Sequence, residues 1–309
     1  MNVAITGASG FVSRQLALAH LARGDRVRAL SRGPASMLPV GVELASGDLL
    51  GAIPANFLGG ADVLYHCAGE IRDPAAMENV NVEGTRRLLQ AAQGRIGRWV
   101  QLSSIGVHGP VRSGMVDERT ECRPQGPYET SKRDGEALIP PAASTGGFSY
   151  SILRPSIVFG AGMPNQSLYQ LIRAVRARLF FFVGAPGASA NYVHIAGVVD
   201  ALMRCGSASA AAGRTYNLSD HTSIEEFVAA IAAELGIAAP RLRLPEALAR
   251  GAALFSFLPR FPLTRSRVDA LTTRVVYSIE RIRAELGYAH PMTIRQGLTE
   301  LVAEWKARQ

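Results

Sequence analysis

The stretch that decides the fold is Val3-Ala4-Ile5-Thr6-Gly7-Ala8-Ser9-Gly10-Phe11-Val12, near the start of the 309-residue chain. Its first four residues form an apolar β-strand pattern, and residues 11–23 have the spacing of an amphipathic helix. Gly7 and Gly10 stand in the turn, where a bound group can approach the backbone and the free N–H groups of a helix N-terminus. This strand–turn–helix pattern predicts a site for a dinucleotide pyrophosphate. Ser13 stands where many such motifs have a third glycine, and a serine is small enough for that position.

The same alternation of strand and helix continues to Pro155. Five more short, apolar runs are predicted strands, at residues 27–30, 42–44, 63–67, 99–103 and 149–153. Amphipathic stretches at 76–93 and 129–139 are predicted helices. Right-handed crossovers between such units predict an α/β, Rossmann-like, doubly wound parallel sheet with its ligand crevice at the carboxyl ends of the strands.

Beyond Pro155 the pattern changes to helices separated by Gly- and Pro-rich loops. The predicted helices cover residues 165–178, 195–206, 223–236, 245–256 and 294–307. We therefore expect a smaller, mainly helical C-terminal substrate lobe. The expected division is a Rossmann domain of residues 1–160 with a return segment of about 190–220, and a substrate lobe of residues 161–189 and 221–309.

The composition is that of a folded globular enzyme, with 48% hydrophobic and 19% charged residues. Cys67, Cys122 and Cys205 lie far apart without metal-binding spacing, so we predict reduced thiols, no disulfide framework and no metal site. The N-terminus has no basic segment, and no apolar stretch approaches membrane-spanning length. These features predict a cytoplasmic protein without a membrane partner.

The net charge of +8 is concentrated toward the end of the chain. Residues 241–309 contain twelve Arg and Lys against six Asp and Glu, which favours an anionic ligand there. No helix-turn-helix pattern or basic stripe interleaved with aromatic residues is present in the sequence, so we predict no nucleic-acid partner.

The strongest chemical signal is Tyr128-Glu129-Thr130-Ser131-Lys132. The chain has only two lysines, and Lys132 falls four residues after Tyr128, on one helical face. Ser104 closes the strand predicted at 99–103, at the sheet edge that holds the cofactor. A nearby ammonium lowers the pKa of a phenol, which is ordinarily about 10. We therefore predict that Tyr128 exchanges a proton with a substrate oxygen, that Lys132 lowers its pKa, and that Ser104 bonds the same oxygen.

The end of the second predicted strand bears on the choice of cofactor. An acidic residue there would mark NAD, whereas this chain has Ser31 and Arg32, and an arginine accepts a 2′-phosphate. NADP is therefore favoured over NAD, the alternative being that Arg32 is a solvated loop residue. Asp48 and Leu49, after the third strand, are expected near the adenine.

In these motifs the chain resembles an extended short-chain dehydrogenase/reductase of the NAD(P)-dependent epimerase/dehydratase family. The resemblance covers nearly the whole length. The matching pieces are Thr6 to Val12, Asp48-Leu49, His66 to Gly69, Asn81 to Thr85, Ser103 to Gly109, Tyr128 to Lys132, Leu153 to Gly160 and Tyr192-Val193-His194.

The resemblance implies a nucleotide pocket and a catalytic set. Ser104, Tyr128 and Lys132 would carry catalysis. Arg154 and His194 also match family positions, but buried residues of these types are more often structural, so neither is assigned to catalysis. The implied cofactor-binding residues are Gly7, Gly10, Phe11, Val12, Ser31, Arg32, Asp48, Leu49, Ala68, Gly69, Tyr128, Lys132, Pro155 and Ile157.

Two substrate classes remain open. Asn165 resembles a family residue that reaches a nucleotide sugar, and Arg265 and Arg267 could bind its diphosphate or could be solvated. Against this, sugar-nucleotide epimerases commonly carry an Arg-Asp pair where this chain has Ala190-Asn191.

The second class is an apolar alcohol or ketone. The tail from Leu263 to Tyr288 resembles, more loosely, relatives that act on hydroxysteroids, and residues 179–183 could line an apolar pocket or belong to the core. We therefore predict a nucleotide-sugar epimerase or 4-ketoreductase. The alternative is a dehydrogenase/reductase for an apolar alcohol or ketone, and a third hypothesis is a non-catalytic NAD(P)-binding regulator. Family members are often homodimers through helices equivalent to 76–93 and 129–139.

Overall fold

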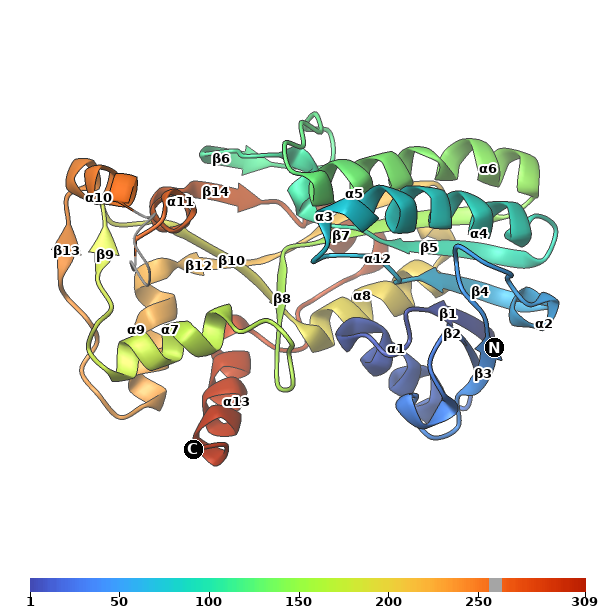
Figure 1. Cartoon of the computed structure of the whole chain (residues 1–309), viewed down its shortest axis with the longest axis horizontal. Helices are drawn as coiled ribbons and strands as arrows, with labels where there is room; N and C mark the ends of the chain where they lie inside the picture. The colour runs from blue at the N-terminus through green and yellow to red at the C-terminus, as the bar shows by residue number, and fades with distance from the viewer. Residues whose placement is uncertain (256–262) are drawn as a thin grey trace.

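The computed structural model describes residues 1–255 and 263–309, and its centre is a seven-stranded, all-parallel sheet (Figure 1). The strand order is β11-β7-β5-β4-β1-β2-β3. This confirms the predicted Rossmann-like, doubly wound α/β fold. The bounds are β1 (Asn2–Thr6), β2 (Arg26–Ser31), β3 (Glu43–Ser46), β4 (Ala61–His66), β5 (Ile96–Leu102), β7 (Ser149–Pro155) and β11 (Arg214–Leu218).

Helices cover both faces of this sheet because its strands are apolar on both sides. On one face, α1 (Phe11–Ala22), α8 (Ile195–Ser207) and α12 (Glu280–Leu286) pack in a core with Val3, Ile5 and Val100. On the other face, α4 (Gly84–Ala92) and α6 (Ile139–Gly146) pack around the fully buried Trp99, and α5 (Pro127–Ala137) lies alongside (Figure 1).

Two predicted helices are broken in the structure. The stretch 76–93 forms α3 (Pro74–Met77), a π-helical segment (Glu78–Glu83) and α4, with the Asn81 side chain buried at the wide turn. The stretch 129–139 falls across α5 and the start of α6, where Pro140 and Pro141 occupy the first turn. A proline lacks the N–H that would continue the preceding helix, so the chain starts a new one.

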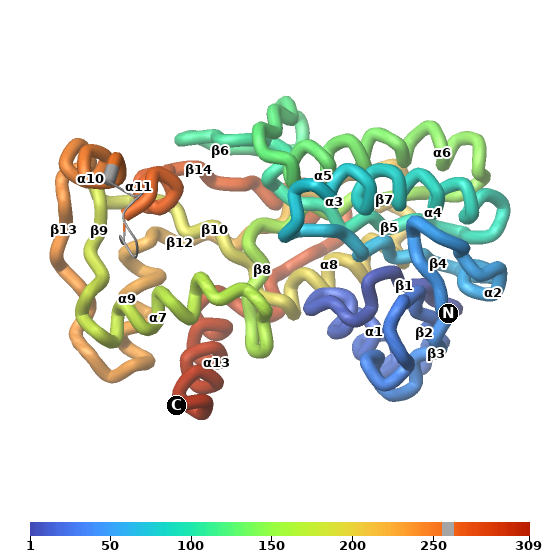
Figure 2. Tube along the Cα trace, in the orientation of Figure 1, coloured from blue at the N-terminus to red at the C-terminus, as the bar shows by residue number. Residues whose placement is uncertain are grey.

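The other end of the molecule combines small sheets with helices (Figure 2). A three-stranded sheet joins β8 (Ile157–Phe159), β10 (Ser189–His194) and β12 (Asp220–Ser223). Helices α7 (Ser167–Arg176), α9 (Ile224–Glu234) and α13 (Ile294–Ala307) enclose a second core that includes Phe227 and Trp305. These three helices confirm the predictions at 165–178, 223–236 and 294–307.

Two parallel strand pairs were not predicted, because isolated strands of two to four residues leave little pattern in a sequence. They are β6 (Ser113–Val116) with β14 (Arg274–Tyr277), and β9 (Phe182–Val183) with β13 (Arg243–Leu244). The predicted helix at 245–256 corresponds to α10 (Glu246–Ala252) and a 3-10 turn (Ala253–Phe255), and its last residue lies outside the described part. The remaining elements are η1 (Ala35–Met37), α2 (Ala55–Leu58), η3 (Ile105–His108), η4 (Ser209–Ala211) and α11 (Arg265–Thr272).

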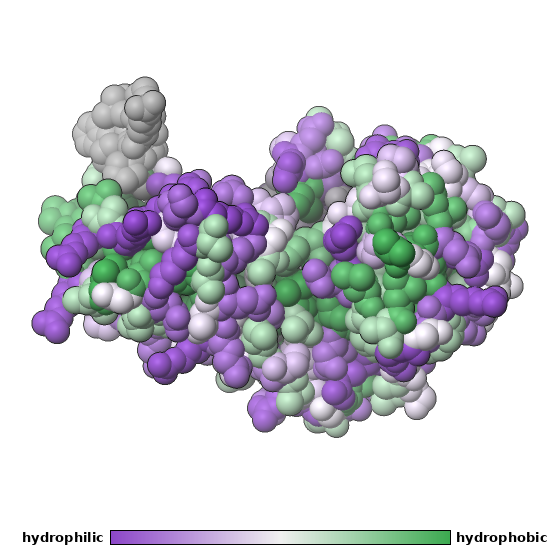
Figure 3. All heavy atoms as spheres, turned by 90° about the horizontal axis from the view of Figure 1, so that it is seen from below, coloured by the Kyte–Doolittle hydropathy of each residue, from purple (hydrophilic) through white to green (hydrophobic). Residues whose placement is uncertain are grey.

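Within residues 1–255 and 263–309, no helix is long and apolar enough to cross a membrane. Over the same residues, no three His, Cys, Asp or Glu side chains gather where they could hold a metal ion. Figure 3 shows hydrophilic residues spread along the length of the face that it views.

Candidate active site

The glycine turn after β1 is tightly constrained. Gly7 has φ +69°, and a Cβ on it would lie 2.8 Å from the Cα of Ala68, which follows β4. Only glycine tolerates both the left-handed backbone and this close approach. The turn is closed by the Gly10 N–H, which donates to the Gly7 carbonyl at 2.8 Å.

The N-terminus of α1 offers its amides to a ligand. The N-cap residue is Gly10, and no side chain caps the helix there. Ser13 is buried, and its hydroxyl donates to the carbonyl of Gly7, so this residue holds the turn as well as fitting the third-glycine position. A glycine cradle followed by uncapped helix amides fits the pyrophosphate of a dinucleotide.

The residues predicted for the adenosine end lie on the loops after β2 and β3. Arg32 is 82% exposed, and its Nη1 is 3.9 Å from Asp48 Oδ2. Ser31 Oγ accepts the Gly33 N–H at 3.1 Å, and Asp48 Oδ1 accepts the Leu50 N–H at 3.0 Å, so both side chains stabilise their own loops. Leu49 is buried against Gly84. The structure thus brings Arg32 and Asp48 to one rim of the sheet.

Lys132 lies in the interior at the carboxyl end of the sheet. Its Nζ donates to the carbonyl oxygen of Leu102 at 2.7 Å, and a Cβ on Gly69 would lie 3.7 Å from that nitrogen. Burial lowers the pKa of Lys132 to about 8, and the charge of Glu136 opposes that effect. The predicted cofactor residues Gly69 and Lys132 are therefore neighbours.

Tyr128 and Ser104 are near each other, but the pKa of the Tyr128 phenol is raised, whereas the sequence predicted that it would be lowered. The Ser104 hydroxyl lies close enough to the Tyr128 phenol to lower its pKa. Ser104 Oγ itself accepts the Gly106 N–H at 3.1 Å. Burial, and then the charge of Glu129, raise the pKa of Tyr128, while Ser104 opposes the rise. Lys132 is not among the groups that shift this pKa, and burial sets the direction, so the predicted lowering by Lys132 is not found in this structure.

A buried hydrogen-bond network lies beneath the site, and the sequence motifs did not predict it. Thr85 donates its hydroxyl proton to the Asn81 carbonyl at 2.7 Å, so it accepts from His66 Nε2 at 2.9 Å. The other ring nitrogen, Nδ1, then accepts from Thr6 Oγ1 at 2.7 Å. Burial lowers the pKa of His66 to about 3, so the ring is neutral near pH 7, as this pattern of one donated and one accepted bond requires.

Asn81 connects this chain to the helix that carries Tyr128. Its Nδ2 donates to the Glu70 carbonyl at 3.0 Å and to Ser131 Oγ at 2.9 Å, and its Oδ1 accepts the Glu70 N–H at 2.7 Å. Ser131 Oγ donates to the Tyr128 carbonyl at 2.9 Å. The stretch Asn81 to Thr85 carried the family resemblance, and that was the one signal in the sequence for this network.

The residues after β5 and β7 complete the edge. Pro155 is buried at the end of β7, and Ile157 is 49% exposed at the start of β8. Arg154 binds Glu136 in a buried ion pair. His194 Nδ1 accepts the Ala196 N–H at 3.3 Å, which caps α8. These contacts are consistent with the expectation that His194 is structural.

The predicted substrate residues lie on separate elements. Asn165 is exposed, and its Oδ1 accepts the Ser167 N–H at 2.8 Å at the start of α7. Arg265 and Arg267 are exposed in the first turn of α11, and the Arg267 N–H donates to Thr264 Oγ1. In the run 179–183, Phe182 and Val183 are core residues, whereas Leu179 is 73% exposed. That run therefore belongs mostly to the core.

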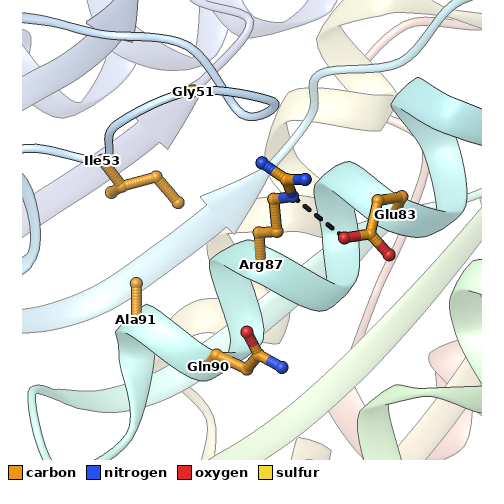
Figure 4. Close-up of a pocket in the computed structure, with 6 residues that line it drawn as sticks. All are labelled: Gly51, Ile53, Glu83, Arg87, Gln90 and Ala91. Atoms are coloured by element: carbon orange, nitrogen blue, oxygen red, sulfur yellow. Dashed lines mark hydrogen bonds and ion pairs between the residues drawn. The ribbon is translucent and has the colours of Figure 1, made fainter.

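Two surface hollows lie away from Ser104, Tyr128 and Lys132. The first, of about 650 Å³, is lined by Gly51, Ile53, Glu83, Arg87, Gln90 and Ala91. Figure 4 shows Arg87 directed toward the Gly51 loop while its guanidinium pairs with Glu83. The second, of about 550 Å³, includes Arg112, Arg250 and Arg265. Asp269 already binds two of these arginines, Arg112 and Arg250, at 3.0 Å each.

Comparison with known proteins agrees with this arrangement. A 4-hydroxy-2-methyl-3-oxo-4-farnesyl-3,4-dihydroquinoline-1-oxide ketoreductase from Stigmatella aurantiaca is 30% identical, over 97% of this chain and 96% of the relative. A GDP-6-deoxy-D-mannose reductase from Pseudomonas aeruginosa is 27% identical, over 98% and 97%. The structure of UDP-glucuronic acid 4-epimerase from Bacillus cereus in complex with NAD superposes with a TM-score of 0.78 at 19% identity, over 100% and 99%, which supports the fold.

The family model that matches residues 3–219 is described as the NAD dependent epimerase/dehydratase family. The match begins in β1 and ends just after β11, so it spans the whole parallel sheet. The glycine cradle, the uncapped helix amides and the buried Lys132 described above all lie within it. The chain belongs to the NAD-dependent epimerase/dehydratase family of enzymes.

Proposed function

We propose that this protein is an NAD(P)-dependent oxidoreductase that interconverts a secondary alcohol and a ketone on an apolar substrate. The observation that carries the proposal is Ala190 on β10, which is 2% exposed where sugar-nucleotide enzymes commonly have an arginine. The neighbouring Asn191 donates from Nδ2 to the Val275 carbonyl at 2.9 Å, so its amide is engaged with β14. Neither residue offers a charge to a diphosphate. The 30% identical relative is named as a ketoreductase of a farnesylated quinoline oxide, which supports the same class.

The proposed chemistry needs a proton donor beside a hydride carrier. When bound, the nicotinamide supplies or accepts the hydride. Tyr128 exchanges the proton with the substrate oxygen, and the neighbouring Ser104 hydroxyl bonds that same oxygen. Lys132, one helical turn after Tyr128 on α5, is proposed to add positive charge next to these two hydroxyl groups. Pro155 and Ile157 are proposed to flank the nicotinamide, with Gly7, Gly10, Phe11 and Val12 at the pyrophosphate and Ala68 and Gly69 beside it.

The proposed cofactor is NADP. Arg32 is exposed, and its one described ion pair is the long 3.9 Å contact with Asp48, so its guanidinium is accessible to a 2′-phosphate.

We also propose that the protein is cytoplasmic and forms a homodimer. In each subunit, residues 1–160 and about 190–220 are proposed to bind the cofactor, and the remaining residues are proposed to bind the substrate.

A nucleotide sugar is the second candidate substrate. The hollow beside α10 and α11 places Arg112, Arg250 and Arg265 together, which favours an anion, and the GDP-6-deoxy-D-mannose reductase is a 27% identical relative. In this case Asn165, Arg265 and Arg267 are the proposed substrate contacts.

One experiment distinguishes the two candidates. Purified protein with saturating NADPH is heated with GDP, with UDP, or with a farnesylated or steroidal ketone, and the melting temperature is measured. A ligand that binds the folded state at 100 times its Kd stabilises it by about 2.7 kcal/mol. We expect a shift with an apolar ketone alone, followed by NADPH oxidation with that ketone. A shift with GDP or UDP and none with the ketones would overturn the proposal in favour of a nucleotide sugar.

A further inference from the structure

A buried ion pair lies one helical turn beyond Lys132. Glu136 follows Lys132 by four residues on α5. The Arg154 guanidinium, on β7, forms an ion pair with the Glu136 carboxylate. Arg154 Nε is 3.0 and 3.2 Å from the two carboxylate oxygens, and Nη2 is 2.5 Å from Oε2. The two side chains are 10% and 7% exposed. A forked, charge-assisted contact of this kind fixes the carboxylate in one position.

Stability alone does not account for this pair. Removing two charges from water costs several kcal/mol for each ion, and a pair of apolar residues of similar volume is often as stable. A buried pair beside a reactive group therefore invites a functional explanation.

Lys132 and Glu136 lie four residues apart on α5, so their side chains project from the same face of the helix. Lys132 is 8% exposed, and its one described hydrogen bond is the contact with the Leu102 carbonyl. Burial disfavours the charged ammonium, and Glu136 is the largest influence in the other direction. The charge of Lys132 acts on His66 and Cys67 at the end of β4, and the charges of Glu136 and Arg154 act on His108 in η3 and Cys122 before α5. Tyr128 lies one turn before Lys132 on α5.

We propose that Glu136 is a positioning residue that keeps Lys132 charged, and that Arg154 holds the Glu136 carboxylate in place while limiting how strongly it favours that charge. Glu136 touches neither substrate nor cofactor in this proposal; it acts through Lys132. The inference rests on the proposed function only in giving Lys132 a catalytic role. The charge balance among the three residues can be measured without any substrate.

The composition of the chain makes that measurement direct. Lys132 and Lys306 are its two lysines, so protein labelled with ¹³C at the lysine Cε gives two side-chain signals in an NMR titration. Lys306 is exposed on α13 and serves as an internal reference, and a Lys306→Arg variant assigns it. In the unaltered protein we expect Lys132 to titrate near its pKa of about 8.

Two variants move the charge balance in opposite directions. Glu136→Gln keeps the side-chain volume but leaves Lys132 facing Arg154 without an anion, so its midpoint falls by about one pH unit, a tenfold change in the protonation constant. Arg154→Gln frees the carboxylate to act on Lys132 alone, so the midpoint rises. Asp134→Asn, on the same helix but paired with Arg133 at the surface, leaves it unchanged. A purely structural role would not move the midpoint in opposite directions.

The result that overturns the proposal is a Lys132 midpoint that stays in place in Glu136→Gln. If that variant does not fold, Glu136→Asp, which keeps the negative charge on a shorter side chain, must still shift the Lys132 midpoint down. Once a substrate is known, the alkaline limb of the kcat/KM profile must follow the NMR midpoints. A protein that turns over no substrate but shows these shifts refutes the proposed function and leaves this inference standing.

Discussion

Lys132 Nζ donates a hydrogen bond to the carbonyl oxygen of Leu102 at 2.7 Å, across 30 residues of sequence. This contact fixes α5 against the end of β5, two residues before Ser104. Tyr128 lies one turn earlier on the same helix, and the Ser104 hydroxyl is near enough to lower the pKa of its phenol. The contact therefore sets the geometry in which a phenol, a hydroxyl and an ammonium share one sheet edge.

Replacing Tyr128 by Phe tests the proton exchange. The variant keeps the ring and loses only the hydroxyl, so we expect turnover to fall by a factor on the order of 10³ while cofactor affinity changes less than about twofold. NADPH oxidation gives the first quantity, and NADPH fluorescence on binding gives the second. Near-normal turnover would show that another group supplies the proton.

Replacing Gly7 by Ala tests the cofactor turn. The new Cβ would lie 2.8 Å from the Ala68 Cα at a left-handed backbone position, so we expect a loss of about 1–3 kcal/mol of stability and at least about tenfold weaker cofactor binding. Gly24→Ala is the matched control, because Gly24 has φ +79° with open space around it. Urea unfolding of both variants measures the cost of placing alanine at a left-handed backbone position. Cofactor titration of both variants measures the additional effect of the clash with Ala68 at the cofactor turn. Equal cofactor affinities in the two variants would contradict the assignment of this turn.

Replacing Arg32 by Gln tests the preference for NADP. A charge-assisted contact to a phosphate contributes about 1.5–3 kcal/mol, so the Kd for NADPH should rise by at least about tenfold while that for NADH stays within about twofold. The Arg32 side chain is 82% exposed, so the fold should be unaffected. Arg26→Gln, exposed at the other end of β2, is the control. Parallel loss of both cofactors would mean that Arg32 does not read the phosphate.

Acid destabilisation should depend on His66. Its folded-state pKa is about 3, below the ordinary value of 6.5, so the unfolded chain binds a proton first as the pH falls. The stabilisation is present above pH 6.5 and is lost progressively toward pH 3; by pH 5 the loss from this residue is about 2 kcal/mol. Urea unfolding at pH 7 and pH 5 measures it. His66→Gln should reduce the difference, whereas the exposed His221→Gln should not.

The sequence determined the fold class and the residues that we propose to be catalytic. Six of the seven strands of the sheet are apolar runs bounded by turn residues. The strand, the glycine turn and the helix start of the cofactor motif all lie within the consecutive residues Val3 to Val12. The spacing of Tyr128 and Lys132 is likewise local, because four residues are one turn of helix. Features encoded within one element can be seen without knowing what the element packs against.

The tertiary structure alone decided how these residues are tuned. Glu136 and Arg154 are 18 residues apart, and His66 meets Thr6 from 60 residues away. The direction of the Tyr128 pKa shift depends on burial, which sums contributions from many distant segments and has no local signal in the sequence. The sequence therefore named the proposed catalytic groups, and the packing of distant segments set the direction of their pKa shifts.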